Sequence, residues 1–265
     1  MFKSLYRMHS NPERVLPEAV LTGKGALVLL IIFLSEQLVA SGISVLISLF
    51  QLPLGLMEIN MIVNGGALLA MIFFFHGFFI QNIKSFFKEF KSIYLWLPIV
   101  SYICSFMANM VVQMILMLVR GELQNTSNNE LVMELLYQYP LQLVLLTVII
   151  APITEEAVFR AALSRSMTAS HKAWVRPIGF VLSIFLFSFF HVYQYVFFAT
   201  DASGAVYLTF NMNEFLSILV YIPMAVGLTL CSYFGRNYWC SVICHMITNS
   251  VALFMLLMVG HQAVK

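Results

Sequence analysis

Charged residues are scarce in this 265-residue sequence, at 10%, while 61% of its residues are hydrophobic. A soluble domain usually contains about a quarter charged residues, so the composition excludes an ordinary water-soluble fold. The formal net charge of +2 is also too small to favour a nucleic-acid partner. The apolar residues come in runs of about 20, the length that spans a bilayer core, without the short alternation of a transmembrane β-barrel. The sequence therefore predicts an all-α fold, a polytopic transmembrane helical bundle.

Cysteine is rare as well, with four residues in the chain. Their spacing does not resemble a secreted disulfide framework, and all lie in or beside apolar runs. We interpret them as small packing residues: Cys104, Cys231, Cys240 and Cys244. The pattern CxxxCH, which ends at His245, is a weak match to a metal site, and the HExxH pattern of zincins is absent from the sequence.

The apolar runs predict about seven transmembrane helices in a single membrane-embedded domain, 1–265. Residues 1–25 form a polar N-terminal segment, residues 26–138 contain the N-terminal spans, and residues 139–260 form the core. The fourth span is expected to begin at Leu141 and to continue helically through TEEAVFRAAL, after an amphipathic segment that ends near Pro140. The other six spans are predicted at Ala26–Leu49, Asn60–Ile80, Tyr94–Val119, Pro177–Phe198, Phe215–Phe234 and Trp239–Val259.

Basic residues fall on alternate connections between these spans, while the opposite connections carry Arg120 and otherwise mostly acidic residues. The positive-inside rule then predicts a multi-pass protein of the cell membrane with a cytosolic N-terminus and an external C-terminus. The basic residues that set this orientation are Lys3, Arg7, Arg14, Lys24, Lys84, Lys88, Lys91, Arg160, Arg165, Lys172, Arg176 and Arg236.

Several ionisable residues lie within the apolar runs, where each is costly and suggests a function. Glu155 and Glu156 continue the fourth span, and Arg160 follows Glu156 by one helical turn, so these two can pair. Glu155 then projects about 100° away around the helix and is available for chemistry. The alternative interpretation is a pair of interfacial acids that reach toward lipid headgroups.

Two further spans add His191, His245 and Asn249, the last two separated by four residues and so on one helical face. Counted from the cytosolic ends of their spans, Glu155 lies about 15 Å deep, His245 about 10 Å and His191 about 20 Å. Span boundaries and helix tilt each change such a depth by about 5 Å, so the three residues could lie at one level in the membrane. A carboxylate with an imidazole can activate water, and a histidine with an asparagine can stabilise an oxyanion. The same groups could instead hold a metal ion, and each histidine alone could be interhelical glue.

Three motifs in this set resemble a known family. EEAVFR contains EExxxR, FSFFH contains FxxxH, and HMITN contains HxxxN, in this order and in separate apolar segments between Glu155 and Asn249. Together they resemble the CAAX protease and bacteriocin-processing family, also called the Abi family of intramembrane proteases. Many members have Gly after EExxxR where this chain has Ala161. The first three spans do not contribute to the resemblance.

The resemblance implies proteolysis within the membrane, near the cytosolic face. Glu155 and His191 would activate water, His245 and Asn249 would hold the oxyanion, and Glu156 and Arg160 would support them. Zinc is possible, with Glu155, His191 and His245 as candidate ligands, although we favour a site without a cofactor because an amide is a poor zinc ligand. The implied partners are the lipid bilayer and a peptide or membrane-anchored protein substrate.

Two other functions remain open from the sequence. The first is a non-catalytic role in bacteriocin immunity or as a membrane scaffold, since some members of the family are immunity proteins. The second is a proton-coupled transporter, for which the sequence shows no inverted repeat. Glu36 and Gln37 in the first span are interpreted as interhelical glue in preference to cavity-lining residues.

Overall fold

The fold is a bundle of long apolar helices, seen in a computed structural model that describes residues 4–9, 18–88, 92–121, 126–168, 174–200 and 206–263. Six of the helical segments in these ranges are long and apolar enough to cross a membrane, and a seventh, Val175–Phe190, is shorter. The prediction of an all-α, multi-pass membrane protein with about seven spans is confirmed. The connections that carry Lys91 and Lys172 lie outside the described residues, and the orientation stays a prediction.

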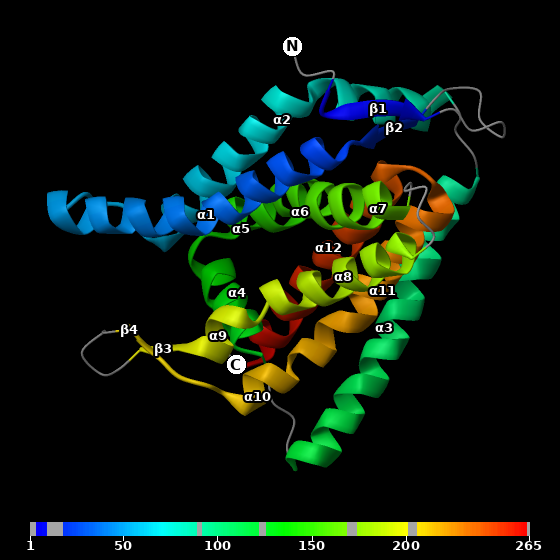
Figure 1. Cartoon of the computed structure of the whole chain (residues 1–265). Helices are drawn as coiled ribbons and strands as arrows, with labels where there is room; N and C mark the ends of the chain where they lie inside the picture. Colours follow the sequence, from blue (N-terminus) through cyan, green and yellow to red (C-terminus); the bar gives the residue numbers. More distant parts are fainter. Residues whose placement is uncertain are drawn as a thin grey trace.

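The N-terminal part consists of two long helices and a small hairpin. Helix α1 (Gly23–Phe50) begins where the Thr22 side chain accepts a hydrogen bond from the Gly25 amide, and helix α2 (Leu56–Lys88) returns alongside it (Figure 1). Strands β1 (Tyr6–His9) and β2 (Glu18–Leu21) form an antiparallel hairpin whose second strand packs on α2. The polar segment predicted at residues 1–25 therefore contains ordered structure that covers the bundle.

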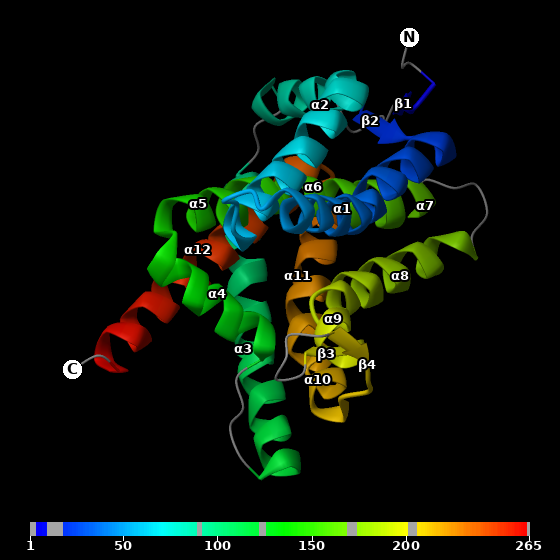
Figure 2. The same cartoon turned by 90° about the vertical axis from the view of Figure 1, so that its left-hand side faces the viewer.

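Helix α3 (Ile93–Arg120) and helix α11 (Ile218–Gly235) run side by side (Figure 2). Their close approach depends on Gly227, because a Cβ atom there would overlap the Ser105 side chain. Small residues at such crossings let helix backbones pack closely in membranes. The short helix α10 (Met212–Leu216) precedes α11, and α4 (Ser127–Gln138) follows α3.

The fourth span is a continuous helical rod with two wide turns. It consists of α5 (Pro140–Val144), the π-helix η1 (Leu145–Ile150), α6 (Ala151–Glu156), the π-helix η2 (Ala157–Arg165) and α7 (Ser166–Thr168). The prediction that the helix continues through TEEAVFRAAL is confirmed, but the π-helical turns were not expected. Such turns are found frequently at functional sites because they leave backbone carbonyls free.

The prediction of one helix over Pro177–Phe198 is wrong beyond Phe190. Helix α8 (Val175–Phe190) stops at His191, a short helix α9 (Tyr193–Phe197) follows, and β3 (Phe198–Thr200) pairs with β4 (Val206–Leu208) in a projecting hairpin (Figure 1). The His191 side chain donates a hydrogen bond to the Phe187 carbonyl, which would accept from a backbone amide of the following turn if the helix continued. The break therefore arises at a site residue and fixes where its side chain lies.

The last helix, α12 (Tyr238–Ala263), passes close to the fourth span. The main core is formed by buried residues of β2, α1, α2, α3, η2, α8, α11 and α12. Cys231, Cys240 and Cys244 are buried free thiols in this core, whereas Cys104 is exposed on α3. The interpretation of the cysteines as small packing residues therefore fits the three buried ones and does not fit Cys104.

Candidate active site

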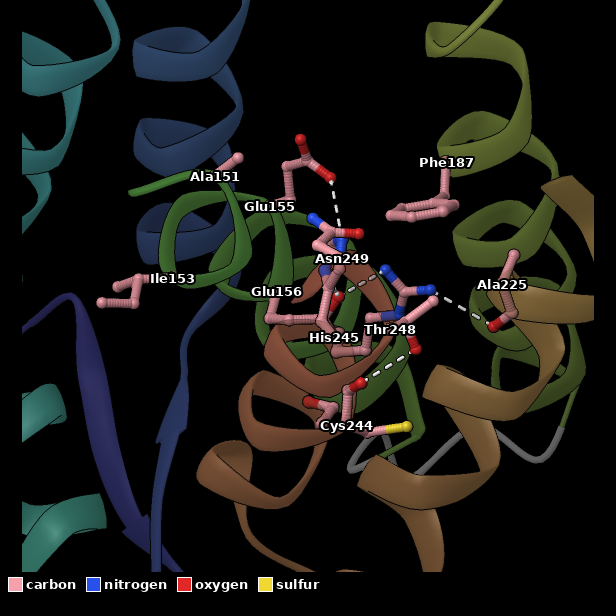
Figure 3. Close-up of polar contacts among 12 residues, drawn as sticks. Ala151, Ile153, Glu155, Glu156, Phe187, Ala225, Cys244, His245, Thr248 and Asn249 are labelled. Carbon is pink, nitrogen blue, oxygen red and sulfur yellow. Dashed lines mark hydrogen bonds and ion pairs between the residues drawn. The ribbon is translucent and has the colours of Figure 1, made fainter. Parts of the chain in front are cut away.

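Glu156 and Arg160 form a fully buried ion pair, as their spacing predicts. Arg160 Nη1 donates to Glu156 Oε1 over 2.9 Å, and both side chains have 0% of their surface exposed. A second guanidinium nitrogen, Nη2, donates to the Ala225 carbonyl on α11 over 3.2 Å (Figure 3). Because a buried charge is stable only when it is paired and hydrogen-bonded, Glu156 and Arg160 anchor η2 to its neighbours.

The same carboxylate oxygen also holds His245. His245 Nδ1 lies 3.0 Å from Glu156 Oε1, and the ring is almost fully buried. A carboxylate paired with Arg160 only accepts, so Nδ1 carries the hydrogen of this bond. The hydrogen bond therefore fixes the orientation of the imidazole and leaves Nε2 to face the site.

Glu155 projects to the other side of the helix and faces this free nitrogen. Its Oε2 atom lies 3.9 Å from His245 Nε2, which is too long for a direct hydrogen bond (Figure 3). The side chain is 21% exposed, yet Oε2 itself is buried and has no hydrogen-bond partner among the described residues. A carboxylate oxygen and an imidazole nitrogen thus face one another with no direct bond between them, an arrangement that suits a water molecule bound to both.

His191 reaches the same place from the end of α8. Its Nδ1 donates to the Phe187 carbonyl over 2.7 Å, so Nε2 is the nitrogen available for chemistry. Phe187 links the two histidines, since its ring centroid lies 4.5 Å from that of His191 and 5.6 Å from that of His245. The Arg160 guanidinium carbon lies 4.2 Å from the same ring, within cation–π range. The FxxxH spacing therefore places the Phe187 ring beside His191, where the same ring also contacts His245 and Arg160.

Asn249 is held by the wide turn of the fourth span. The amide of Ala151 bonds to Leu146 in the π pattern, and Pro152 has no amide hydrogen, so neither engages the Thr147 carbonyl. Asn249 Nδ2 donates to that free carbonyl over 2.7 Å. An amide nitrogen carries two hydrogens, and the second remains for a ligand.

The structure brings together the residues that the motifs single out, from three segments of the chain. Glu156 joins Arg160 to His245, Glu155 faces His245, and Phe187 joins His245 to His191. Within the described ranges, no group of three or more His, Cys, Asp and Glu side chains is arranged to hold a metal ion. The absence of a cofactor remains a prediction, and the separate roles of these residues do as well.

Three residues next to the site are not indicated by any of the sequence motifs. They are Thr147, whose carbonyl holds Asn249, Ala225, whose carbonyl holds Arg160, and Tyr221 on α11, whose ring centroid lies 4.7 Å from that of His191. Two act through the backbone, which is invisible to motif analysis. For Thr147, Pro152 in the following turn is the one local signal of a free carbonyl.

Comparison with known families bears directly on this site. Residues 137–251 match the family model described as type II CAAX prenyl endopeptidase Rce1-like. The resemblance to the CAAX protease family is confirmed. The match contains all six polar residues of the site and begins after the first three spans, so the similarity to this family lies in the C-terminal part of the chain. No curated protein and no solved structure matches the chain.

Proposed function

We propose that this protein is an intramembrane endopeptidase that hydrolyses a peptide bond in a membrane-associated protein or peptide near the cytosolic face. The observation that carries the proposal is the buried chain of contacts from Arg160 through Glu156 to His245, with Glu155 facing the free nitrogen of that histidine. A purely structural role, in which these side chains only hold helices together, would require only some of these contacts. A base, an oriented imidazole and a supporting ion pair together are what hydrolysis needs.

In the proposed mechanism Glu155 and His191 hold the attacking water. Glu155 takes one proton as the water oxygen forms a bond to the carbonyl carbon of the substrate, and His191 Nε2 accepts a hydrogen bond that orients the water. Glu155 then gives this proton to the leaving amine as the C–N bond breaks. The products are a new carboxyl terminus and a new amino terminus, and Glu155 returns to its ionised form.

The oxyanion formed on the way is stabilised from α12. In this proposal His245 carries hydrogens on both nitrogens, so that Nδ1–H donates to Glu156 over 3.0 Å and Nε2–H donates to the oxyanion. Asn249 adds the amide hydrogen that Thr147 does not use. Each such donor typically contributes about 10²–10³ in kcat when aimed at the developing charge.

The first substrate class to test is a prenylated C-terminal sequence, because the matched family is described by that activity. The apolar exterior of the helices keeps such a substrate close to the site, since a prenyl chain partitions into the same bilayer. Bacteriocin precursors and signalling peptides are the alternatives that the wider family suggests.

The test uses purified protein in liposomes with a synthetic peptide that ends in a prenylated CAAX sequence. We expect wild type to cleave it, Glu155→Gln to be inactive, and Glu58→Gln, which changes an acid on α2 remote in sequence from the motifs, to remain active. Mass spectrometry in ¹⁸O-labelled water should find the label in the new carboxyl terminus. Full cleavage by Glu155→Gln would overturn the mechanism. A wild-type protein that cleaves neither this peptide nor, in the same assay, a bacteriocin precursor or a signalling peptide would favour an immunity or scaffold function.

A further inference from the structure

Tyr221 on α11 contacts the active site but belongs to none of its three motifs. Its ring centroid lies 4.7 Å from that of His191, and the two ring planes are inclined by 31°. The Phe187 ring contacts the same imidazole at 4.5 Å and 43°. The imidazole of His191 therefore has two aromatic neighbours, one on its own helix and one on α11.

The position of the His191 ring matters because one hydrogen bond does not fix its plane. The bond from Nδ1 to the Phe187 carbonyl, at 2.7 Å, fixes one nitrogen of the ring. Rotation of the ring about that bond would still move Nε2, the nitrogen that orients the water in the proposed mechanism. Groups that take part in catalysis have to lie within about 0.5 Å of their productive positions. Aromatic rings packed on the imidazole restrict this rotation.

The ring of Tyr221 also packs against the chain that follows His191. It contacts a small buried cluster formed by Val192, Val196 and Ile218. Val192 and Val196 lie at the break between α8 and α9, directly after the histidine. Tyr221 therefore supports both the imidazole and the backbone that carries it.

The hydroxyl of Tyr221 is held by two residues at the start of α4. Asn128 Nδ2 donates to the Tyr221 hydroxyl oxygen over 3.2 Å, and Thr126 Oγ1 lies 3.2 Å from the same oxygen. Asn128 supplies the hydrogen of the first bond, so the hydroxyl hydrogen of Tyr221 can be donated to Thr126. Thr126 is 3% exposed and caps α4, since its Oγ1 atom accepts from the Asn129 amide.

The start of α4 has a second attachment that does not involve Tyr221. Glu214 Oε1 on α10 accepts hydrogen bonds from the Ser127 amide, at 3.3 Å, and from the Ser127 hydroxyl. Removal of the Tyr221 hydroxyl therefore leaves α4 attached. The start of α4 can act as a fixed point to which Tyr221 connects the histidine.

We propose that Tyr221 is a positioning residue of the active site, whose ring sets the plane of the His191 imidazole and whose hydroxyl fixes that ring to the start of α4. This proposal rests on the proposed function of His191 in orienting the water. Tyr221 acts through His191 and takes no part in the chemistry itself. Thr126 and Asn128 precede the matched residues 137–251, so part of the support for the site lies outside the region of family similarity.

The first experiment compares kcat and KM of wild type, Tyr221→Phe and Tyr221→Leu on the prenylated CAAX peptide in liposomes. Tyr221→Phe keeps the ring and loses its attachment to α4, so we expect kcat to fall roughly tenfold while KM stays nearly unchanged. Tyr221→Leu loses the ring as well, and a displacement of about 1 Å at the histidine should lower kcat by about 10²-fold. A residue that only fills the apolar cluster would be replaced by Phe without loss. Wild-type kcat in Tyr221→Phe would therefore overturn the proposal.

Two control variants separate this effect from general changes in the fold. Tyr233→Phe makes the same chemical change at an exposed position near the other end of α11. Ser127→Ala removes one bond from the start of α4 to Glu214 and leaves both partners of the Tyr221 hydroxyl in place. Both controls should keep the wild-type kcat. A fall in Ser127→Ala as large as that in Tyr221→Phe would contradict the proposal, because the order of α4 alone would then explain the loss.

The second experiment does not depend on activity. Nuclear magnetic resonance of the protein in detergent, with ¹³C at the Cε1 atoms of histidine, detects the His191 ring directly, and His191→Gln assigns its signal. Tyr221→Leu removes the ring current that acts on His191, so this signal should move, whereas the signal of His76, exposed on α2, should stay in place. An unchanged His191 signal in Tyr221→Leu would overturn the proposal at any level of activity. Failure of the proposed function would appear separately, as full cleavage by Glu155→Gln.

Discussion

The most informative perturbation of the supporting structure is Glu156→Gln. One oxygen of Glu156 accepts from both Arg160, over 2.9 Å, and His245, over 3.0 Å. The substitution keeps the shape of the side chain and removes its charge. Arg160 would then be a buried cation, 0% exposed, with an uncharged amide as its partner.

The expected cost follows from that burial. Removing one partner of a buried ion pair typically costs about 3–5 kcal/mol, because the remaining charge has lost its compensation. The amide oxygen of Gln and the Ala225 carbonyl retain some hydrogen bonding, so we expect the lower end, about 3 kcal/mol. For a chain of this size that corresponds to a fall of roughly 6–12 °C in the unfolding midpoint. Activity should fall as well, since His245 loses the charged acceptor that orients its imidazole ring.

Thermal unfolding in detergent, followed by circular dichroism, measures this effect. Glu58→Gln is the matched control, because it changes a partly exposed acid that accepts from the Gly55 amide, and its midpoint should stay within about 2 °C of wild type. The double variant Glu156→Gln/Arg160→Gln removes both charges and should cost less than the sum of the two single changes. A wild-type midpoint in Glu156→Gln, or strictly additive effects in the double variant, would refute the reasoning.

Three further predictions concern the oxyanion, the orientation and the metal. Asn249→Ala should lower kcat by about 10²-fold while substrate binding changes little, as steady-state kinetics will measure; an unchanged kcat would remove Asn249 from the oxyanion site. Cysteine-accessibility labelling should place Lys88 in the cytosol and Asn128 outside, and labelling of both from one side would contradict the span count. The purified protein should contain no stoichiometric zinc and remain active in a strong chelator, whereas one tightly held metal per chain, lost with activity in His245→Ala, would favour a metalloprotease.

Much of the fold could be predicted because the bilayer imposes simple rules on the sequence. A span needs about 20 apolar residues, and the predicted starts Ala26, Tyr94 and Trp239 lie within three residues of the observed starts of α1, α3 and α12. The break after Phe190 could not be seen in the same way. It depends on which group bonds the Phe187 carbonyl, and the apolar run continues past it regardless. The hairpin of β1 and β2 was missed because short strands in a polar segment have no strong periodicity.

The site was predictable to the extent that helical spacing determines it. The pairing of Glu156 with Arg160 and the divergence of Glu155 follow from the 3.6-residue period, and the ion pair is confirmed. That Glu156 also binds His245 was not predictable, because this contact depends on how α12 packs against the fourth span. The burial of Glu36 depends similarly on the packing of α1, which no motif in the sequence describes.

The measurement that tests the central claim most directly makes no assumption about the substrate. Cells producing wild type, Glu155→Ala, Glu58→Gln or no protein are compared by quantitative mass spectrometry of their peptides and of the termini of their membrane proteins. Glutamate-dependent proteolysis predicts at least one new terminus in cells with wild type and Glu58→Gln that is missing from the other two. Identical sets of termini for wild type and Glu155→Ala, with equal protein levels, would contradict it.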